Sequence, residues 1–145
     1  MAVVVPGFEE HEWAEDELQV LTDRGLTTIA THLDRFGRVR VAVDQNEQRW
    51  ALKAVDYGSS ELGHIQRLLD DPSPLNHTIP ASLVPCKNAV IILMPRLHEV
   101  CEMKWQSLHE ILECIGQMIE GALYMQDEML SHFVRIFLFI ISPAS

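Results

Sequence analysis

The sequence has few cysteines, few basic residues and no long apolar run. Its three cysteines, Cys86, Cys101 and Cys114, are an odd number without metal-binding spacing, so we expect reduced thiols rather than a disulfide framework. Only 11 lysines and arginines stand against 21 acidic residues, which gives a formal net charge of −10. A chain of this charge repels nucleic acid and anionic membranes, and we expect neither as a partner.

No apolar stretch reaches the roughly 20 residues needed to cross a bilayer. Residues 1–7 lack the basic flank and the apolar length of a signal peptide, so the sequence predicts a cytoplasmic or nuclear protein. The composition, with 48% hydrophobic and 22% charged residues, is that of a globular chain. A length of 145 residues suffices for one domain with a modest core.

The first half of the chain predicts a helix followed by an antiparallel meander. Residues 8–24 are polar and acidic, and we expect a helix whose carboxylates are solvated. A metal site of His11 with these carboxylates is the alternative, although the ligand spacing of known sites is absent. Strands are predicted at 27–33, 38–41 and 50–55, where β-branched residues or alternating polarity occur close together in the sequence.

The second half predicts a short helix, a buried strand and a long helix. One of the serines after Gly58 should cap the short helix, which Pro72 ends. A short strand is expected between Pro80 and Pro85, and residues 89–94 read as a strand buried on both faces and stopped by proline. The long helix, 105–130, has apolar residues at helical spacing. These are Leu108, Ile111, Leu112, Ile115, Met118, Ile119, Ala122 and Leu123. The predicted class is α+β.

Three motifs in this order resemble those of protein kinase domains. They are Trp50-Ala51-Leu52-Lys53, Asn76-His77-Thr78-Ile79-Pro80 and Met94-Pro95-Arg96. The similarity runs from about Thr27 to His132, and it is to fungal kinase-like proteins in particular. It implies an N-terminal lobe of antiparallel sheet plus one helix, followed by the first helices of the C-terminal lobe.

The resemblance also implies a nucleotide site. In the family, a lysine on the third strand holds the α- and β-phosphates of ATP and a helix glutamate orients it. These roles fall to Lys53 and Glu61, and Ala51 would contact adenine. The end of the Gly-rich loop, the gatekeeper and the two backbone groups that bond adenine complete the implied site: Gly37, Val39, Met94, Pro95 and Leu97.

The sequence departs from the family in the phosphate-covering loop. His32 and Asp34 stand where its first two glycines are expected, and a carboxylate there repels phosphate, so we expect weak ATP binding. Other interpretations of the same residues stay open. Lys53 could be a solvated charge at a strand end, Glu61 a carboxylate favoured by its helix dipole, and residues 34–37 an ordinary hairpin turn.

The resemblance stops at His132. Phe133 and Val134 follow where the family has the arginine and the catalytic aspartate, so we expect neither a catalytic residue nor Mg²⁺ ligands, and no phosphoryl transfer. The implied divisions are an acidic extension (1–26), a sheet lobe with its hinge (27–97), the start of a helical lobe (98–132) and an apolar tail (133–145).

The change of character at Phe133 leaves two further hypotheses. The chain could be a truncated or misread gene product without function. It could also be a pseudokinase-like interaction module that binds a protein partner through the apolar face of the long helix, which would be left uncovered.

Overall fold

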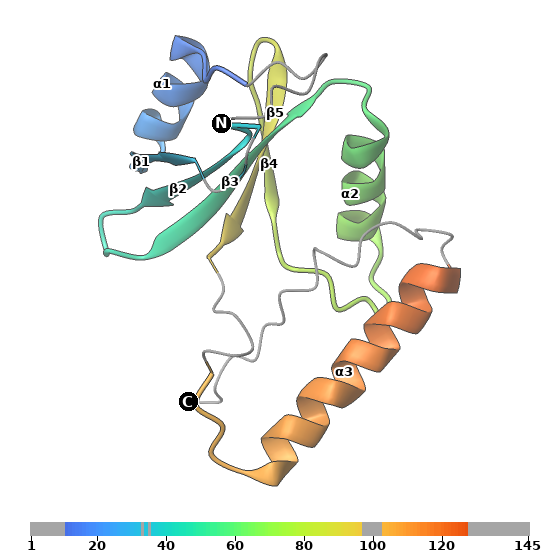
Figure 1. Cartoon of the computed structure of the whole chain (residues 1–145). Helices are drawn as coiled ribbons and strands as arrows, with labels where there is room; N and C mark the ends of the chain where they lie inside the picture. The colour runs from blue at the N-terminus through green and yellow to red at the C-terminus, as the bar shows by residue number, and fades with distance from the viewer. Residues whose placement is uncertain (1–10, 33, 35, 97–102, 128–145) are drawn as a thin grey trace, which may run out of the picture. The chain divides into compact units, whose positions relative to one another are not determined.

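A computed structural model describes residues 11–32, 34, 36–96 and 103–127 of the chain. Over these residues it is an α+β protein with a five-stranded antiparallel sheet and three helices, which confirms the predicted class (Figure 1). The elements are α1 (Glu15–Asp23), β1 (Thr27–His32), β2 (Val39–Val43), β3 (Arg49–Asp56), α2 (Ser60–Asp70), β4 (Ser82–Pro85), β5 (Ala89–Pro95) and α3 (Leu108–Asp127). Within the described part no helix is long and apolar enough to cross a membrane.

The chain forms two compact units. Unit 1 runs to Leu62 and also contains Ala81–Arg96, so it includes the whole sheet and α1. Unit 2 contains Gly63–Pro80 and α3. The compact units divide within α2, after Pro80 and after Arg96, and the predicted division put its boundary after residue 97.

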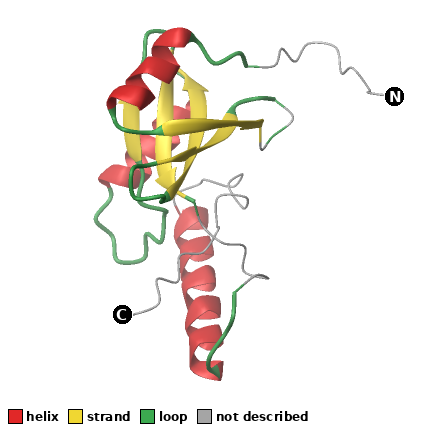
Figure 2. Ribbon diagram, turned by 90° about the vertical axis from the view of Figure 1, so that its left-hand side faces the viewer, coloured by secondary structure: helices red, strands yellow, loops and turns green. Residues whose placement is uncertain are grey.

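The sheet has the strand order β1-β2-β3-β5-β4. Figure 2 shows its strands in yellow. The predicted meander is confirmed, because β1 pairs with β2 and β2 with β3, both antiparallel. The expected short strand after Pro80 is β4, which pairs with β5 at the edge of the sheet. The strand predicted to be buried on both faces is β5, whose residues Ala89–Leu93 are all buried.

The two faces of the sheet carry different residues. In an antiparallel pair, residues opposite each other share a face and successive residues alternate. Lys53 lies opposite Val39 of β2 and Ile92 of β5, and Ala51 lies opposite Met94. We call this side the Lys53 face.

The other side, the α1 face, holds a hydrophobic core cluster of unit 1. Leu52 and Ala54 point to it from β3, and α1 packs against them through Leu21, which is fully buried. The cluster contains Trp13, Leu21, Leu26, Ala42, Leu52, Ala54, Val84, Cys86, Ile91 and Leu93.

Helix α1 is shorter than predicted, and one of its carboxylates is buried. The predicted helix began at residue 8, whereas α1 begins at Glu15, and residues 1–10 lie outside the described part. The chain is extended at Ala14, because the Glu17 carboxylate reaches back to accept the Ala14 N–H at 3.0 Å. Glu17 is only 2% exposed, so the expectation of a solvated acidic face is wrong for this residue.

Helix α2 has the predicted cap and stripe. The Ser59 hydroxyl accepts the Leu62 N–H at 3.2 Å, which selects Ser59 as the N-cap. Leu62, Ile65 and Leu68 are buried. The helix ends at Asp70, two residues before the proline that was expected to stop it.

Helix α3 exposes most of the stripe that its spacing identified. Its buried residues are Cys114, Gly121, Tyr124 and Met125, and Tyr124 and Met125 pack with Leu68 in unit 2. The Tyr124 hydroxyl donates to Asp71. The predicted end of this helix, with His132 and the apolar tail, lies outside the described residues, as do Leu97 and Cys101. Cys86 and Cys114 are free thiols.

Candidate functional site

Lys53 and Glu61 form an ion pair in unit 1. Lys53 is in the middle of the central strand β3, and Glu61 lies in the first turn of α2, close to its serine cap. The lysine Nζ donates to Glu61 Oε1. The two side chains are 32% and 30% exposed, so each charge is partly withdrawn from water and the partner compensates it. The pair leaves a positioned ammonium on the Lys53 face.

The predicted base-contacting residues lie beside this pair. Val39 is directly opposite Lys53, and Ala51, two residues earlier on β3, is directly opposite Met94. All three are half-buried. The structure therefore brings Val39, Ala51 and Met94 onto one face, next to the ammonium group, as small and flexible apolar side chains.

Two further predicted residues border this face. Pro95 ends β5 opposite Trp50, and the Arg96 N–H that follows donates to the Arg49 carbonyl at 3.0 Å. Gly37 lies in the β1–β2 turn, where its φ of 69° suits glycine. Leu97, the predicted donor to adenine, lies outside the described residues.

The β1–β2 turn is bonded by its own aspartate. Asp34 Oδ1 accepts the Val39 N–H at 2.9 Å, and the Asp34 carbonyl accepts the Gly37 N–H at 3.4 Å. The Asp34 carboxylate, which stands where the family pattern has a glycine, is thus the acceptor of one amide of the turn. Arg38, next in sequence, makes a bidentate ion pair with Asp56 at 3.1 and 3.2 Å, so its charge is compensated within the sheet.

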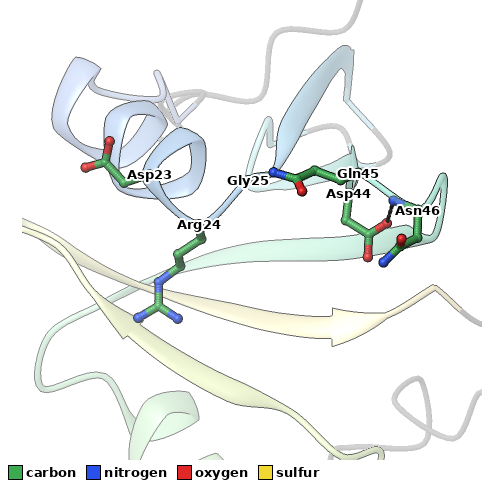
Figure 3. Close-up of a pocket in the computed structure, with 6 residues that line it drawn as sticks. All are labelled: Asp23, Arg24, Gly25, Asp44, Gln45 and Asn46. Atoms are coloured by element: carbon green, nitrogen blue, oxygen red, sulfur yellow. Dashed lines mark hydrogen bonds between the residues drawn. The ribbon is translucent and has the colours of Figure 1, made fainter.

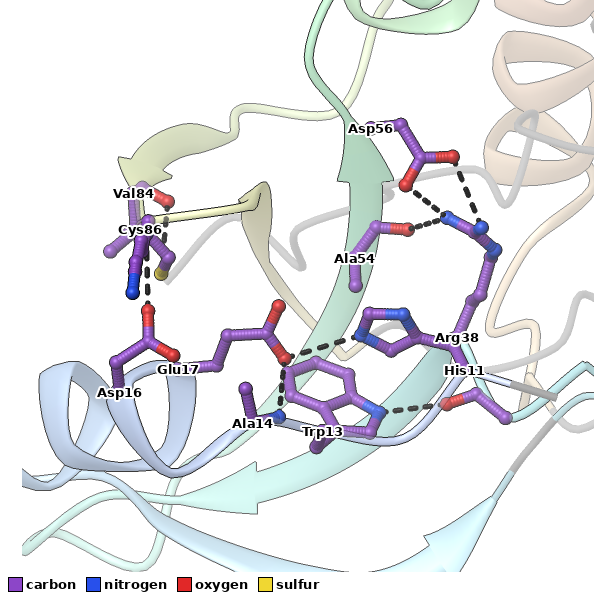
Figure 4. Close-up of polar contacts among 12 residues, drawn as sticks. His11, Trp13, Ala14, Asp16, Glu17, Arg38, Ala54, Asp56, Val84 and Cys86 are labelled. Carbon is purple, nitrogen blue, oxygen red and sulfur yellow. Dashed lines mark hydrogen bonds and ion pairs between the residues drawn. The ribbon is translucent and has the colours of Figure 1, made fainter.

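An N-terminal segment that sequence reasoning did not assign to the site holds the same turn (Figure 4). We call His11–Ala14 the strap. The His11 N–H donates to the Phe36 carbonyl at 2.8 Å, and the buried Trp13 Nε1 donates to the Gly37 carbonyl at 2.7 Å. The signal in the sequence was the single tryptophan within an acidic segment, since such a residue is seldom left in water.

The strap is itself held from two sides. The His11 Nε2 lies 3.2 Å from Glu17 Oε2, and the Arg40 guanidinium lies 5.2 Å from the centroid of the Trp13 ring, within cation–π range. Across the described residues no group of three or more His, Cys, Asp or Glu side chains could hold a metal ion. His11 with Glu17 is a two-residue contact, and the metal alternative for this segment gains no support.

A pocket of about 370 Å³ lies at the far end of β2 from this turn. It is lined by Asp23, Arg24, Gly25, Asp44, Gln45 and Asn46 (Figure 3). Its Asp44 carboxylate accepts the Trp50 Nε1–H at 3.1 Å and the N–H groups of Asn46 and Gln48. These hydrogen bonds, that of Trp50 first, lower the pKa of Asp44. The carboxylate is thus engaged in the β2–β3 turn, and the pocket contains none of the predicted site residues.

Comparison with known proteins adds no family. No protein-family model matches the chain, and no curated protein matches its sequence.

Proposed function

We propose that the chain is a kinase-like nucleotide-binding module whose Lys53 face takes an adenine nucleotide. The observation that carries the proposal is the pairing of Lys53 on β3 with Glu61 in the first turn of α2. Protein kinases use a lysine on the third strand and a glutamate on the following helix in this way to hold the α- and β-phosphates. In the proposed correspondence, the sheet with α2 is the N-terminal lobe and α3 belongs to the first helices of the C-terminal lobe.

Each side chain of the site has a physical role in the proposal. Glu61 holds the Lys53 ammonium at a fixed place, so that its charge meets the phosphates without further ordering. Val39 and Ala51 offer a low apolar surface on which a purine ring can lie. Pro95 follows Met94 and has no backbone N–H. Its proposed role needs only its carbonyl, which can accept a hydrogen bond from the exocyclic amine of adenine.

We expect the affinity to be low. The single ammonium of Lys53 already shares its charge with Glu61, and Asp34 adds a carboxylate to the neighbouring turn. The net charge of −10 opposes the approach of a polyphosphate. The proposed activity is binding without phosphoryl transfer, because Val134 stands at the position of the family's catalytic aspartate.

A thermal melt with and without Mg-ATP tests the proposal. If ATP is present at ten times its Kd, binding should add about 1.4 kcal/mol of stability, which raises Tm by a few degrees. We expect this shift in the wild type and its loss in Lys53→Ala. Lys87→Ala is the matched control, because Lys87 is exposed between β4 and β5, five residues before Ile92, the β5 residue opposite Lys53. An equal shift in all three proteins, or none in the wild type, would contradict the proposal.

A second function, protein interaction, is favoured by α3. Five large apolar side chains of this helix are between 45% and 70% exposed. They are Leu108, Leu112, Ile115, Ile119 and Leu123. A contiguous exposed apolar surface of this kind marks interaction sites in soluble proteins, and we propose that a helical partner binds there.

A further inference from the structure

The exposed apolar residues of α3 form one continuous row. Leu108, Leu112, Ile115, Ile119 and Leu123 follow each other at intervals of three or four residues, so they lie on one side of the helix over four turns. We call this row the α3 seam. The side of α3 that is buried in unit 2 is a different one, with Cys114, Gly121 and Tyr124. The seam therefore has the 3–4 spacing that helices use to pair with another helix.

A row of carboxylates follows the seam on one side. Glu113, Glu120 and Asp127 recur every seven residues, about 10.5 Å apart along the helix, and all three are exposed. Glu120 and Asp127 lie three and four residues from Leu123, which makes them its neighbours on the helix surface. Glu120 also meets His77 at 2.9 Å. Helix α3 contains no lysine or arginine.

This charge pattern disfavours a second copy of the chain as the occupant. In an antiparallel pair of α3 helices, the carboxylate row of one copy would meet the same row of the other. In a parallel pair, it would meet the opposite edge of the seam, where Met118 and the buried Met125 lie, and carboxylates would be desolvated without a partner. Two chains of charge −10 also repel each other.

A membrane surface fits no better. Helices that lie in a bilayer interface carry lysine and arginine on their polar face, which attract anionic lipids. Helix α3 carries glutamate and aspartate there. The complementary partner is instead one whose charges are positive at the spacing of the carboxylates.

We propose that the α3 seam binds an amphipathic helix of a partner protein that carries lysine or arginine every seven residues beside a row of large apolar side chains. This inference rests on the proposed interaction function and is independent of the Lys53 face. Apolar contacts along the seam supply the affinity, and the carboxylate row selects the sign of the partner's charge and its register.

Two synthetic helical peptides test this in the full chain. Both contain three heptads with leucine at seam positions, and they differ only in having lysine or glutamate at the flanking positions. We expect the lysine peptide to bind at least tenfold more tightly than the glutamate peptide, with an affinity that falls as salt is raised. Leu112→Glu should abolish binding, whereas Leu75→Glu, which places the same charge at an exposed leucine outside α3, should leave it unchanged.

A charge exchange separates recognition from mere adhesion. The double variant Glu113→Lys with Asp127→Lys should invert the preference, so that the glutamate peptide binds more tightly. Equal binding of both peptides, or an uninverted preference, would overturn the charge selection while leaving an apolar interaction surface in place. If neither peptide binds, the interaction function is overturned as well. Ultracentrifugation then distinguishes a dimer, in which a second copy occupies the seam, from a monomer, in which another part of the chain covers it. Both results count against the proposal.

Discussion

A tyrosine and an aspartate join two segments of unit 2. The Tyr124 hydroxyl of α3 donates to Asp71, which follows the end of α2. The hydrogen bond from Tyr124 is the main cause that lowers the pKa of Asp71. Burial first, and then the neighbouring Asp71 carboxylate, raise the pKa of Tyr124 to about 12. Both pKa shifts mean that the folded protein favours a protonated Tyr124 phenol next to an ionised Asp71 carboxylate.

The stability of unit 2 should therefore fall in strong alkali. The folded-state pKa of Tyr124 lies above its unfolded value of about 10, so its contribution is complete below pH 10 and is lost as the pH rises through about 12. Asp71 acts in the opposite range, because its lowered pKa gives a contribution present above about pH 4 and lost in acid.

The variant Tyr124→Phe should remove the part of the stability that the wild type loses in alkali. Its Tm is expected to be lower than that of the wild type at pH 8, and the difference should shrink between pH 10 and pH 12. Tyr57→Phe is the control, because the Tyr57 hydroxyl donates at 2.7 Å to the Cys86 carbonyl, an acceptor that does not ionise. A Tm difference for Tyr124→Phe that stays constant across this range would contradict the assignment.

Sequence patterns could identify some of these residues and not others. Lys53 was predicted because it belongs to a short motif, and Glu61 because the resemblance implies a helix glutamate as its partner; the predicted contact between them is present. Glu17 could not be predicted to be buried, because its role depends on its carboxylate reaching back to accept the Ala14 N–H. The same holds for Trp13, whose partner Gly37 lies 24 positions further along the chain.

The strap and the β1–β2 turn form one hydrogen-bonded element although they are remote in sequence. Trp13 Nε1 holds the Gly37 carbonyl from the α1 face, and the Asp34 carboxylate holds the Val39 N–H within the turn. Because of these hydrogen bonds, we expect the strap to keep the turn in one conformation. The turn borders the Lys53 face.

The rate of hydrogen exchange at the Val39 amide measures how firmly the strap holds the β1–β2 turn. Trp13→Phe keeps an aromatic ring in the core but removes the donor to Gly37, which costs about 1–2 kcal/mol. We expect the Val39 amide to exchange roughly 5- to 30-fold faster if opening of the turn controls its exchange. Trp50→Phe loses an equivalent indole donor, to Asp44 at 3.1 Å, and should leave Val39 unchanged. Equal exchange rates in wild type and Trp13→Phe would show that the strap does not hold the turn.

The strands were predictable as elements, whereas the buried side of α3 was not. Alternating polarity and the turn at Gly37 located β2 and β3 to within about two residues. The predicted helix 8–24 began too early, because an acidic run contains no residue that stops a helix and its true start depends on Glu17. Helical spacing identified the apolar stripe of α3, but which side is covered depends on Leu68, a residue of another helix.

The whole molecule presents two candidate binding surfaces of different character. The Lys53 face, in unit 1, combines one paired ammonium with small apolar side chains. The α3 seam, in unit 2, combines large apolar side chains with a carboxylate row. The net charge of −10 acts on both. This charge weakens the binding of a polyphosphate at the Lys53 face and favours the binding of a basic partner at the α3 seam. The α+β class and the order of elements followed from the sequence, but the division into units within α2 did not.

The most direct test of nucleotide binding at the Lys53 face is a titration of ¹³C-methyl-labelled protein with Mg-ATP, followed by NMR. If ATP binds at the Lys53 face, the methyl signals of Val39, Ala51 and Met94 shift together, because these side chains share that face. The methyl signals of Leu52 and Ala54, on the α1 face, should stay in place. Shifts confined to the α1 face, or no shift at millimolar ATP, would contradict nucleotide binding at Lys53.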